Sequence, residues 1–145
     1  MYYNLALLSY TASLFFTAFT VLNQNKVIVT YLGYECLFLC MFGVFGLNPY
    51  CWSNLFFFAW AGEARSKKRK KLCLIYSIAA IIGAFSFLFV TEFLLNEAGG
   101  TYGPIQSYGL GYYLWCSSFV FALLHTLTLK DNGSTSAPEN NKANL

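Results

Sequence analysis

Acidic and phenolic side chains near the borders of apolar stretches are the groups in this sequence best suited to binding a ligand. Glu92 lies near the end of one apolar stretch, and Tyr102, Tyr108 and Tyr112 surround the start of the next. Glu35 joins them if its own apolar segment packs on the same side. Carboxylates attract cations, and aromatic ring faces bind amines and other cations. These five residues are therefore a candidate outer-face binding site, with an ordinary aromatic belt as the alternative.

The single histidine and the five cysteines predict no catalytic or metal centre. His125 alone cannot supply a bis-histidine haem or a histidine-rich metal site. Cys36 and Cys40 are four residues apart, so they share a helical face but do not form a Cys-x-x-Cys motif. Cys51 can pair with either of them in an oxidising compartment, and buried, inert thiols are the other interpretation. We expect no enzyme activity, no cofactor and no metal.

A dense basic cluster lies in the middle of the chain. Six of the seven residues from 65 to 71 are basic: Arg65, Lys67, Lys68, Arg69, Lys70 and Lys71. Such clusters can bind nucleic acid. Because apolar stretches flank this one on both sides, it instead indicates a cytoplasmic loop held at anionic lipid headgroups, and we expect no nucleic-acid partner.

The composition indicates a membrane protein. Of the 145 residues, 57% are hydrophobic and 10% are charged, whereas soluble globular domains carry roughly 25% charged residues. So few charges cannot cover the surface of a soluble domain of this size. The length allows one domain.

The apolar stretches predict an all-α membrane protein with four transmembrane helices, at residues 5–22, 50–65, 72–95 and 108–129. Residues 31–47 form a further apolar segment, separated from the second helix by Asn48-Pro49. This segment is either interrupted or re-entrant, or it is a fifth span. The basic loop places the C-terminus in the cytoplasm. The predicted organisation is one transmembrane helical bundle over residues 1–130 and a disordered cytoplasmic tail over residues 131–145.

Two short motifs carry a family resemblance. Trp52-Ser53-Asn54 begins one apolar helix, and the segment YGLGYYLW over residues 108–115 begins the last. These motifs resemble those of uncharacterised small bacterial multi-pass membrane proteins, which have a WxN helix start and a YGxGYxLW opening to the last helix. The similarity covers residues 33–129, although Leu55 stands where the pattern has proline. It implies a helical membrane protein of the bacterial inner membrane, and it implies no activity.

These observations predict a non-enzymatic integral membrane protein. The expected role is a small accessory or interaction subunit that packs against other membrane helices, either of another membrane protein or of a second copy. The alternative is a subunit of a small transporter or channel that uses the outer-face site. The remaining expected partners are the lipid bilayer and its anionic headgroups.

Overall fold

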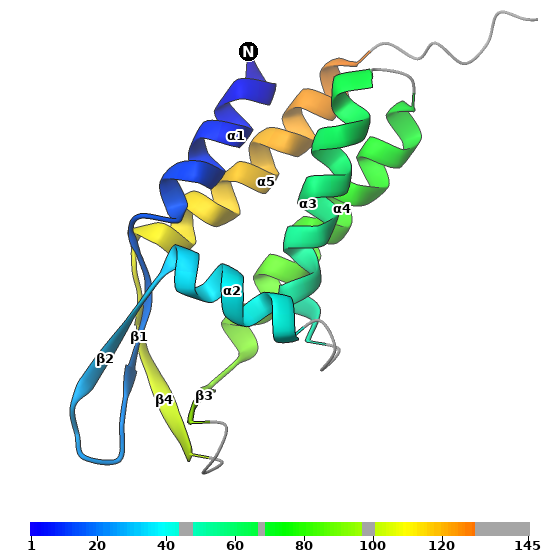
Figure 1. The fold of residues 1–145 in the computed structure, drawn as a ribbon. Helices are drawn as coiled ribbons and strands as arrows, with labels where there is room; N and C mark the ends of the chain where they lie inside the picture. The colour runs from blue at the N-terminus through cyan, green and yellow to red at the C-terminus, as the bar shows by residue number, and fades with distance from the viewer. Residues whose placement is uncertain (44–47, 67–68, 97–100, 130–145) are drawn as a thin grey trace, which may run out of the picture.

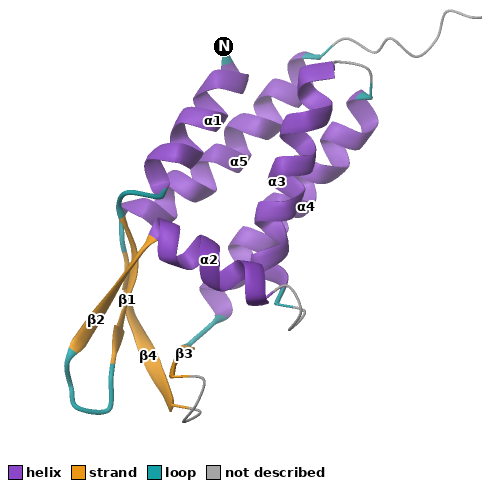
Figure 2. Ribbon diagram, viewed as in Figure 1, coloured by secondary structure: helices purple, strands orange, loops and turns teal. Residues whose placement is uncertain are grey.

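The computed structural model describes residues 1–43, 48–66, 69–96 and 101–129, which fold into five α-helices and a four-stranded antiparallel sheet (Figures 1 and 2). The elements in chain order are α1 (Tyr2–Ser13), β1 (Thr17–Leu22), β2 (Ile28–Leu32), α2 (Gly33–Gly43), α3 (Pro49–Ser66), α4 (Lys70–Ser86), the 3₁₀ turn η1 (Phe87–Phe89), β3 (Glu92–Asn96), β4 (Thr101–Tyr108) and α5 (Leu110–Thr128). Residues 130–145, for which a disordered tail is predicted, lie outside the described residues.

The predicted all-α architecture is wrong, and so is its five-span alternative. The predicted span at residues 5–22 is helical only as far as Ser13 and then becomes β1. The predicted span at residues 72–95 ends its helix at Ser86 and passes through η1 into β3. Among the helices of the described residues, two are long and apolar enough to cross a membrane, Lys70–Phe89 and Leu110–Thr128. The chain is therefore a mixed α/β protein.

A β-hairpin replaces the second half of the first predicted span. β-Branched residues make up three of the six residues of β1 and three of the five of β2, and such residues favour the extended backbone. The turn between the strands is held by Asn23, whose Oδ1 accepts hydrogen bonds from the backbone N–H groups of Asn25 and Val27, both at 2.9 Å. Lys26 completes the turn with a φ of 57°. The strands then pair in register, with Val21 opposite Val29.

The sheet is assembled from segments far apart in the chain. Its strand order is β2-β1-β4-β3, so the N-terminal hairpin pairs through β1 with β4 near the other end of the sequence. Phe19 and Val21 of β1 are buried, and they pack in one cluster with Phe87 of η1 and Tyr112 of α5. This cluster attaches the sheet to the helices.

The four longer helices form a layer with a core of its own. Figure 1 shows α1 beside α5 and α3 beside α4. Phe57 and Trp60 of α3 are fully buried against Phe119 of α5. Helices α3 and α4 approach closely at Gly83, where an added Cβ would lie 2.7 Å from the carbonyl oxygen of Pro49. Small residues at this crossing allow the two backbones to come together.

The two ends of the helical layer differ in charge and in structure. Figure 1 shows the N-terminus, the end of α3, the start of α4 and the end of α5 at one end, with the sheet and α2 at the other. Arg65, Arg69, Lys70 and Lys71 belong to the first end, which we call the basic end. Lys67 and Lys68 lie outside the described residues. We call the opposite end the sheet end.

Candidate functional site: a cavity at the sheet end

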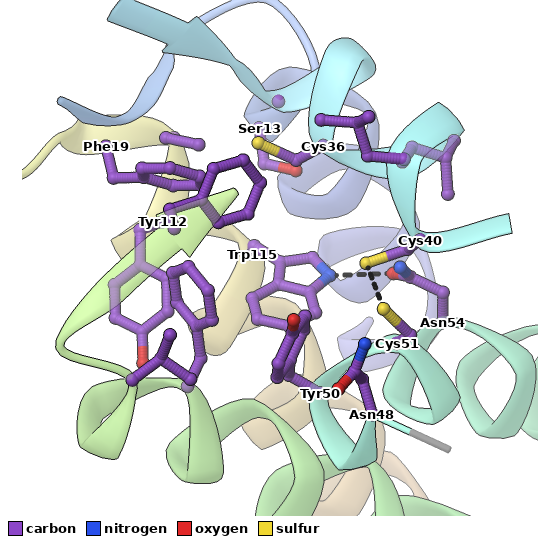
Figure 3. A pocket seen from close by; sticks show the side chains of 18 of the residues that line it. Ser13, Phe19, Cys36, Cys40, Asn48, Tyr50, Cys51, Asn54, Tyr112 and Trp115 are labelled. Atoms are coloured by element: carbon purple, nitrogen blue, oxygen red, sulfur yellow. Dashed lines mark hydrogen bonds between the residues drawn. The ribbon is translucent and has the colours of Figure 1, made fainter. Parts of the chain in front are cut away.

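A cavity of about 510 Å³ lies where the helices, α2 and the sheet meet (Figure 3). Its volume is within the range of small-molecule binding sites in proteins. Its walls come from α1, α2, α3, α5 and the sheet, and they include the side chains used below: Tyr10, Cys40, Cys51, Asn54, Tyr112 and Trp115. Most of the wall is apolar or aromatic, with a few polar groups among the rings.

Helix α2 forms one wall because its start is hydrogen-bonded to the segment that joins α1 to β1. The backbone N–H groups of Gly33 and Tyr34 donate to the carbonyl oxygens of Phe16 and Leu14, at 3.1 and 3.0 Å. A Cβ on residue 33 would collide with the carbonyl group of Ser13, so glycine permits this contact. From that point α2 runs across the sheet ends of the longer helices (Figure 1).

Asn54 is the polar centre of the cavity wall. Its Oδ1 accepts two hydrogen bonds at 2.9 Å, from the hydroxyl of Tyr10 and from the indole Nε1–H of Trp115. An indole N–H can only donate, so the atom facing it must be the amide oxygen. This assigns the orientation of the amide and leaves Nδ2, with its two N–H donors, at the cavity wall. Within the described part of the chain, Nδ2 donates no hydrogen bond.

Three of the five predicted binding residues line this cavity, namely Glu92, Tyr102 and Tyr112. Glu92 and Tyr102 are exposed, with Tyr102 at 57% of its maximal exposure, so they belong to the cavity edge. Tyr112 is buried, and its hydroxyl donates to the carbonyl oxygen of Ala84 at 3.1 Å. Glu92 is the single carboxylate in the described lining. A single exposed carboxylate beside apolar walls attracts a cation less strongly than the predicted site, in which two carboxylates lie together.

The structure does not bring Glu35 and Tyr108 into the cavity lining. The Oε2 of Glu35 instead accepts the backbone N–H of Leu32 at 2.8 Å, at the start of α2. The hydroxyl of Tyr108 donates to the carbonyl oxygen of Phe87 at 3.3 Å, and burial raises the pKa of this tyrosine above its ordinary value. Both side chains therefore stabilise the junction between the helices and the sheet.

Sequence reasoning missed the residues at the centre of the site. Asn54 belongs to the WxN motif but is not among the predicted binding residues, although an asparagine inside an apolar helix is a signal for a buried polar contact. Trp115 is part of the YGLGYYLW motif but is not among the predicted binding residues. Like the predicted residue Tyr112, it points inward and donates a hydrogen bond. Tyr113, by contrast, is 58% exposed.

Two cysteines meet in the cavity wall. The Sγ atoms of Cys40 on α2 and Cys51 on α3 are 2.9 Å apart (Figure 3). Cys36, one turn before Cys40, also lines the cavity. Burial, together with the neighbouring Glu35, raises the pKa of the Cys36 thiol to about 12. Cys36 is therefore a protonated thiol at physiological pH.

The basic end holds a second set of contacts. Arg69 and Glu63 form a partly exposed ion pair at 3.8 Å, and the ring of His125 lies 5.5 Å from that of Tyr3 and 6.0 Å from that of Trp60. The Nε1–H of Trp60 donates to the hydroxyl of Thr126 at 2.9 Å. These contacts pack the helices together and create no reactive group.

Known proteins provide no guide to this site. No protein-family model, curated protein or solved structure matches the chain. In the described residues, no group of three or more histidine, cysteine, aspartate or glutamate side chains is placed to hold a metal ion. The geometry of the cavity and of the helical layer therefore carries the functional argument.

Proposed function

We propose that this chain is a non-enzymatic integral membrane protein, with its helical layer in the bilayer and its sheet outside it. The distribution of polar and apolar side chains in that layer carries the proposal. The interior of the layer contains buried polar side chains: Ser9, Ser53, Asn54, Ser77, Ser118 and Thr126. Its outside carries exposed large apolar side chains: Leu8, Phe58, Ile75, Ile78, Ile82, Phe85, Leu124 and Leu127. Helices packed within lipid have this arrangement, with small and polar residues between them.

Helix α4 shows the arrangement most clearly. Its exposed residues Ile75, Ile78, Ile82 and Phe85 recur at helical spacing and form one continuous apolar stripe. Its opposite side is buried and consists of small residues, including Ser77, Ala80, Gly83 and Ala84. In water, each large side chain of the stripe would lack the roughly 1.5–3 kcal/mol of hydrophobic stabilisation that full burial provides. Acyl chains of a bilayer remove that cost.

The lengths of the helices agree with a bilayer. The 20-residue segment Lys70–Phe89 and the 19-residue helix Leu110–Thr128 would each extend about 30 Å, the thickness of the hydrocarbon core. Helix α1 has 12 residues, or about 18 Å, so it would not cross unaided and would share the layer by packing on α5.

The charges support one orientation. Arg65, Arg69, Lys70 and Lys71 all belong to the basic end, and short loops rich in lysine and arginine stay in the cytoplasm. The sheet end would then lie outside the cytoplasm. Following the family resemblance, we propose the bacterial inner membrane as the location.

Membrane extraction tests the proposal. The protein should remain with membranes during alkaline carbonate extraction, float with them in a density gradient and become soluble in mild detergent. Floating distinguishes insertion from aggregation, because an aggregate sediments. Release into the carbonate supernatant would contradict the proposal.

Within the membrane, we propose that the chain acts as an accessory subunit through packing contacts rather than through catalysis. The apolar stripe of α4 would contact lipid in the isolated protein and the helices of a larger membrane protein in the cell. The measurement is the mass of the particle after extraction with a mild detergent, compared with the 16.3 kDa of one chain. A particle containing only one chain, also after cross-linking in intact membranes, would exclude the accessory role.

The cavity supports a second candidate function, the binding of a membrane lipid at the sheet end. The cavity wall is mainly apolar, and the Nδ2 donors of Asn54 have no described partner. A ligand that satisfies both features has a hydrocarbon body and an acceptor oxygen, as in the ester carbonyl of a glycerolipid. Such an oxygen would accept a hydrogen bond from the amide of Asn54 and would contribute a specific stabilisation.

Asn54→Asp tests lipid binding because it retains an oxygen for Tyr10 and Trp115 but removes the N–H donors. Native mass spectrometry of the detergent-solubilised protein should show a phospholipid on the natural chain and at least tenfold less of it on the variant. The matched control is Asn48→Asp, which changes the same chemical group at another lining residue. Equal lipid occupancy in all three proteins would contradict the role of Asn54.

A further inference from the structure

We propose that Cys40 and Cys51 form a disulfide bond that joins α2 to α3 across the cavity. Their sulfur atoms are 2.9 Å apart, and a disulfide requires about 2.0 Å. A movement of roughly 1 Å would therefore complete the bond. The inference rests on the proposed orientation, because disulfides form and persist on the oxidising, extracytoplasmic side of a membrane.

The position of the two cysteines indicates what the bond would do, which is to attach the later part of α2 to α3. Backbone hydrogen bonds hold the start of α2 through Gly33 and Tyr34. Cys40 lies seven positions beyond Gly33, about two helical turns further along the cavity wall. Cys51 belongs to the first turn of α3 and is 2% exposed. A bond between them would hold the far part of α2 against α3, so that both parts of this wall are attached.

The other cysteines are poorer partners. Cys36 and Cys40 lie on one helix, where every Cα–Cβ bond tilts toward the N-terminus, so their thiols point the same way instead of converging. Cys73 lies near the start of α4 at the basic end, away from the sheet end. Cys116 belongs to α5 and is not part of the described cavity lining. Cys40 and Cys51 are the two whose sulfur atoms are in contact among the described residues.

The bond forms by thiol–disulfide exchange with an external protein disulfide, the oxidant. The thiolate of one cysteine attacks a sulfur of the oxidant, which breaks the oxidant's S–S bond and releases one thiolate from it. The second cysteine then attacks the mixed disulfide, forming the Cys40–Cys51 bond and releasing the other thiolate. Two protons leave the protein, and two electrons reduce the oxidant to a dithiol.

Thiol counting in isolated membranes tests the proposal. The membranes are lysed directly into a denaturant that contains N-ethylmaleimide, so that buried free thiols are blocked as well, and the protein is then reduced and labelled with a maleimide polymer. Two of the five cysteines should become labelled in the natural chain and two of the remaining four in Cys36→Ser, whereas none should become labelled in Cys40→Ser or Cys51→Ser. Chymotrypsin cleaves after Phe42 and Tyr50, so mass spectrometry should find two peptides joined through Cys40 and Cys51.

A reporter fused within the β1–β2 turn separates this inference from the orientation on which it rests. If the reporter is extracytoplasmic and all five thiols were blocked at lysis, the disulfide is disproved and the orientation stands. If the reporter is cytoplasmic and the thiols are reduced, both fail. A bond that involves Cys36 would also overturn the assignment. Joined Cys40 and Cys51 peptides with an extracytoplasmic reporter support both.

Discussion

Trp115 donates its indole N–H to the side-chain oxygen of Asn54 at 2.9 Å, which links α5 to α3 across 61 positions of the sequence. The same oxygen accepts the hydroxyl of Tyr10 from α1, so one buried amide connects three helices. Three helix positions at the sheet end are thus coupled through a single acceptor. The shape of the cavity depends on this arrangement.

Replacing Tyr10 with phenylalanine should lower stability by about 1 kcal/mol, because it removes one buried hydrogen bond while retaining the ring. The ring stack of Tyr10 on Phe57, with centroids 4.5 Å apart, remains. The measurement is chemical unfolding of the detergent-solubilised protein. Tyr113→Phe is the matched control, since this tyrosine is 58% exposed and should change stability by less than about 0.5 kcal/mol. Equal effects of the two variants would show that the Asn54 contact contributes nothing.

Gly83→Ala should destabilise the protein by about 1–3 kcal/mol. The new methyl group would lie 2.7 Å from the carbonyl oxygen of Pro49 and would collide with the hydroxyl of Ser53, forcing α3 and α4 apart. Gly62→Ala is the control, because a Cβ there meets no atom within 4 Å and alanine favours the helix. Thermal unfolding should therefore show a lower midpoint for the first variant and an unchanged or higher one for the second. A neutral Gly83→Ala would mean that the helices do not cross at this point.

Neutralising the basic end should disturb the orientation of the protein. With Lys67, Lys68, Arg69, Lys70 and Lys71 changed to glutamine, reporters after residue 71 and at residue 145 should lose their uniform cytoplasmic signal, because lysine and arginine in short loops set topology. The attraction to anionic lipid should fall by roughly 1 kcal/mol per charge. The same reporters on the natural chain are the control. Unchanged orientation and unchanged yield in the variant would show that hydrophobicity alone directs insertion.

The raised pKa of Cys36 predicts alkaline sensitivity of the sheet end. The thiol has an ordinary pKa of 9.0 and one of about 12 when folded, because burial disfavours the thiolate. Unfolding therefore releases a proton above pH 9. The stability that the neutral thiol contributes is complete below pH 9 and is lost as the pH rises from 9 toward 12. Unfolding midpoints of the natural chain should fall across this window more steeply than those of Cys36→Ser. Parallel pH profiles would contradict the assignment.

The same pKa predicts slow alkylation of Cys36. In a variant that retains Cys36 as its only cysteine, the rate of reaction with a small maleimide should rise about tenfold per pH unit between pH 8 and 11, because only the thiolate reacts. A rate that levels off near pH 9 would show an ordinary, exposed thiol.

The sequence by itself determined the positions of the long helices, because each of them follows from one continuous apolar stretch. Helix α5 begins at Leu110 and ends at Thr128, close to the predicted span at residues 108–129. Helices α3 and α4 flank the basic cluster, as their apolar stretches predict. A long apolar run next to charged residues specifies such a helix through contacts within a few turns. Hydropathy alone gives the wrong structure at residues 17–32. The β-branched residues on either side of the Asn-rich turn are apolar enough to resemble part of a transmembrane helix, yet they favour a hairpin.

Only the tertiary structure decided which residues form the cavity. Tyr10 and Asn54 are 44 positions apart, and Asn54 and Trp115 are 61 apart, so no local pattern links them. The tyrosines of the last helix illustrate the same limit. The predicted outer-face site and its aromatic-belt alternative both place Tyr112 at the surface, whereas packing against Phe87 and the sheet buries it. Local sequence sets which segments can be helices or strands. Which face of each element becomes interior depends on neighbours that the chain brings together only on folding.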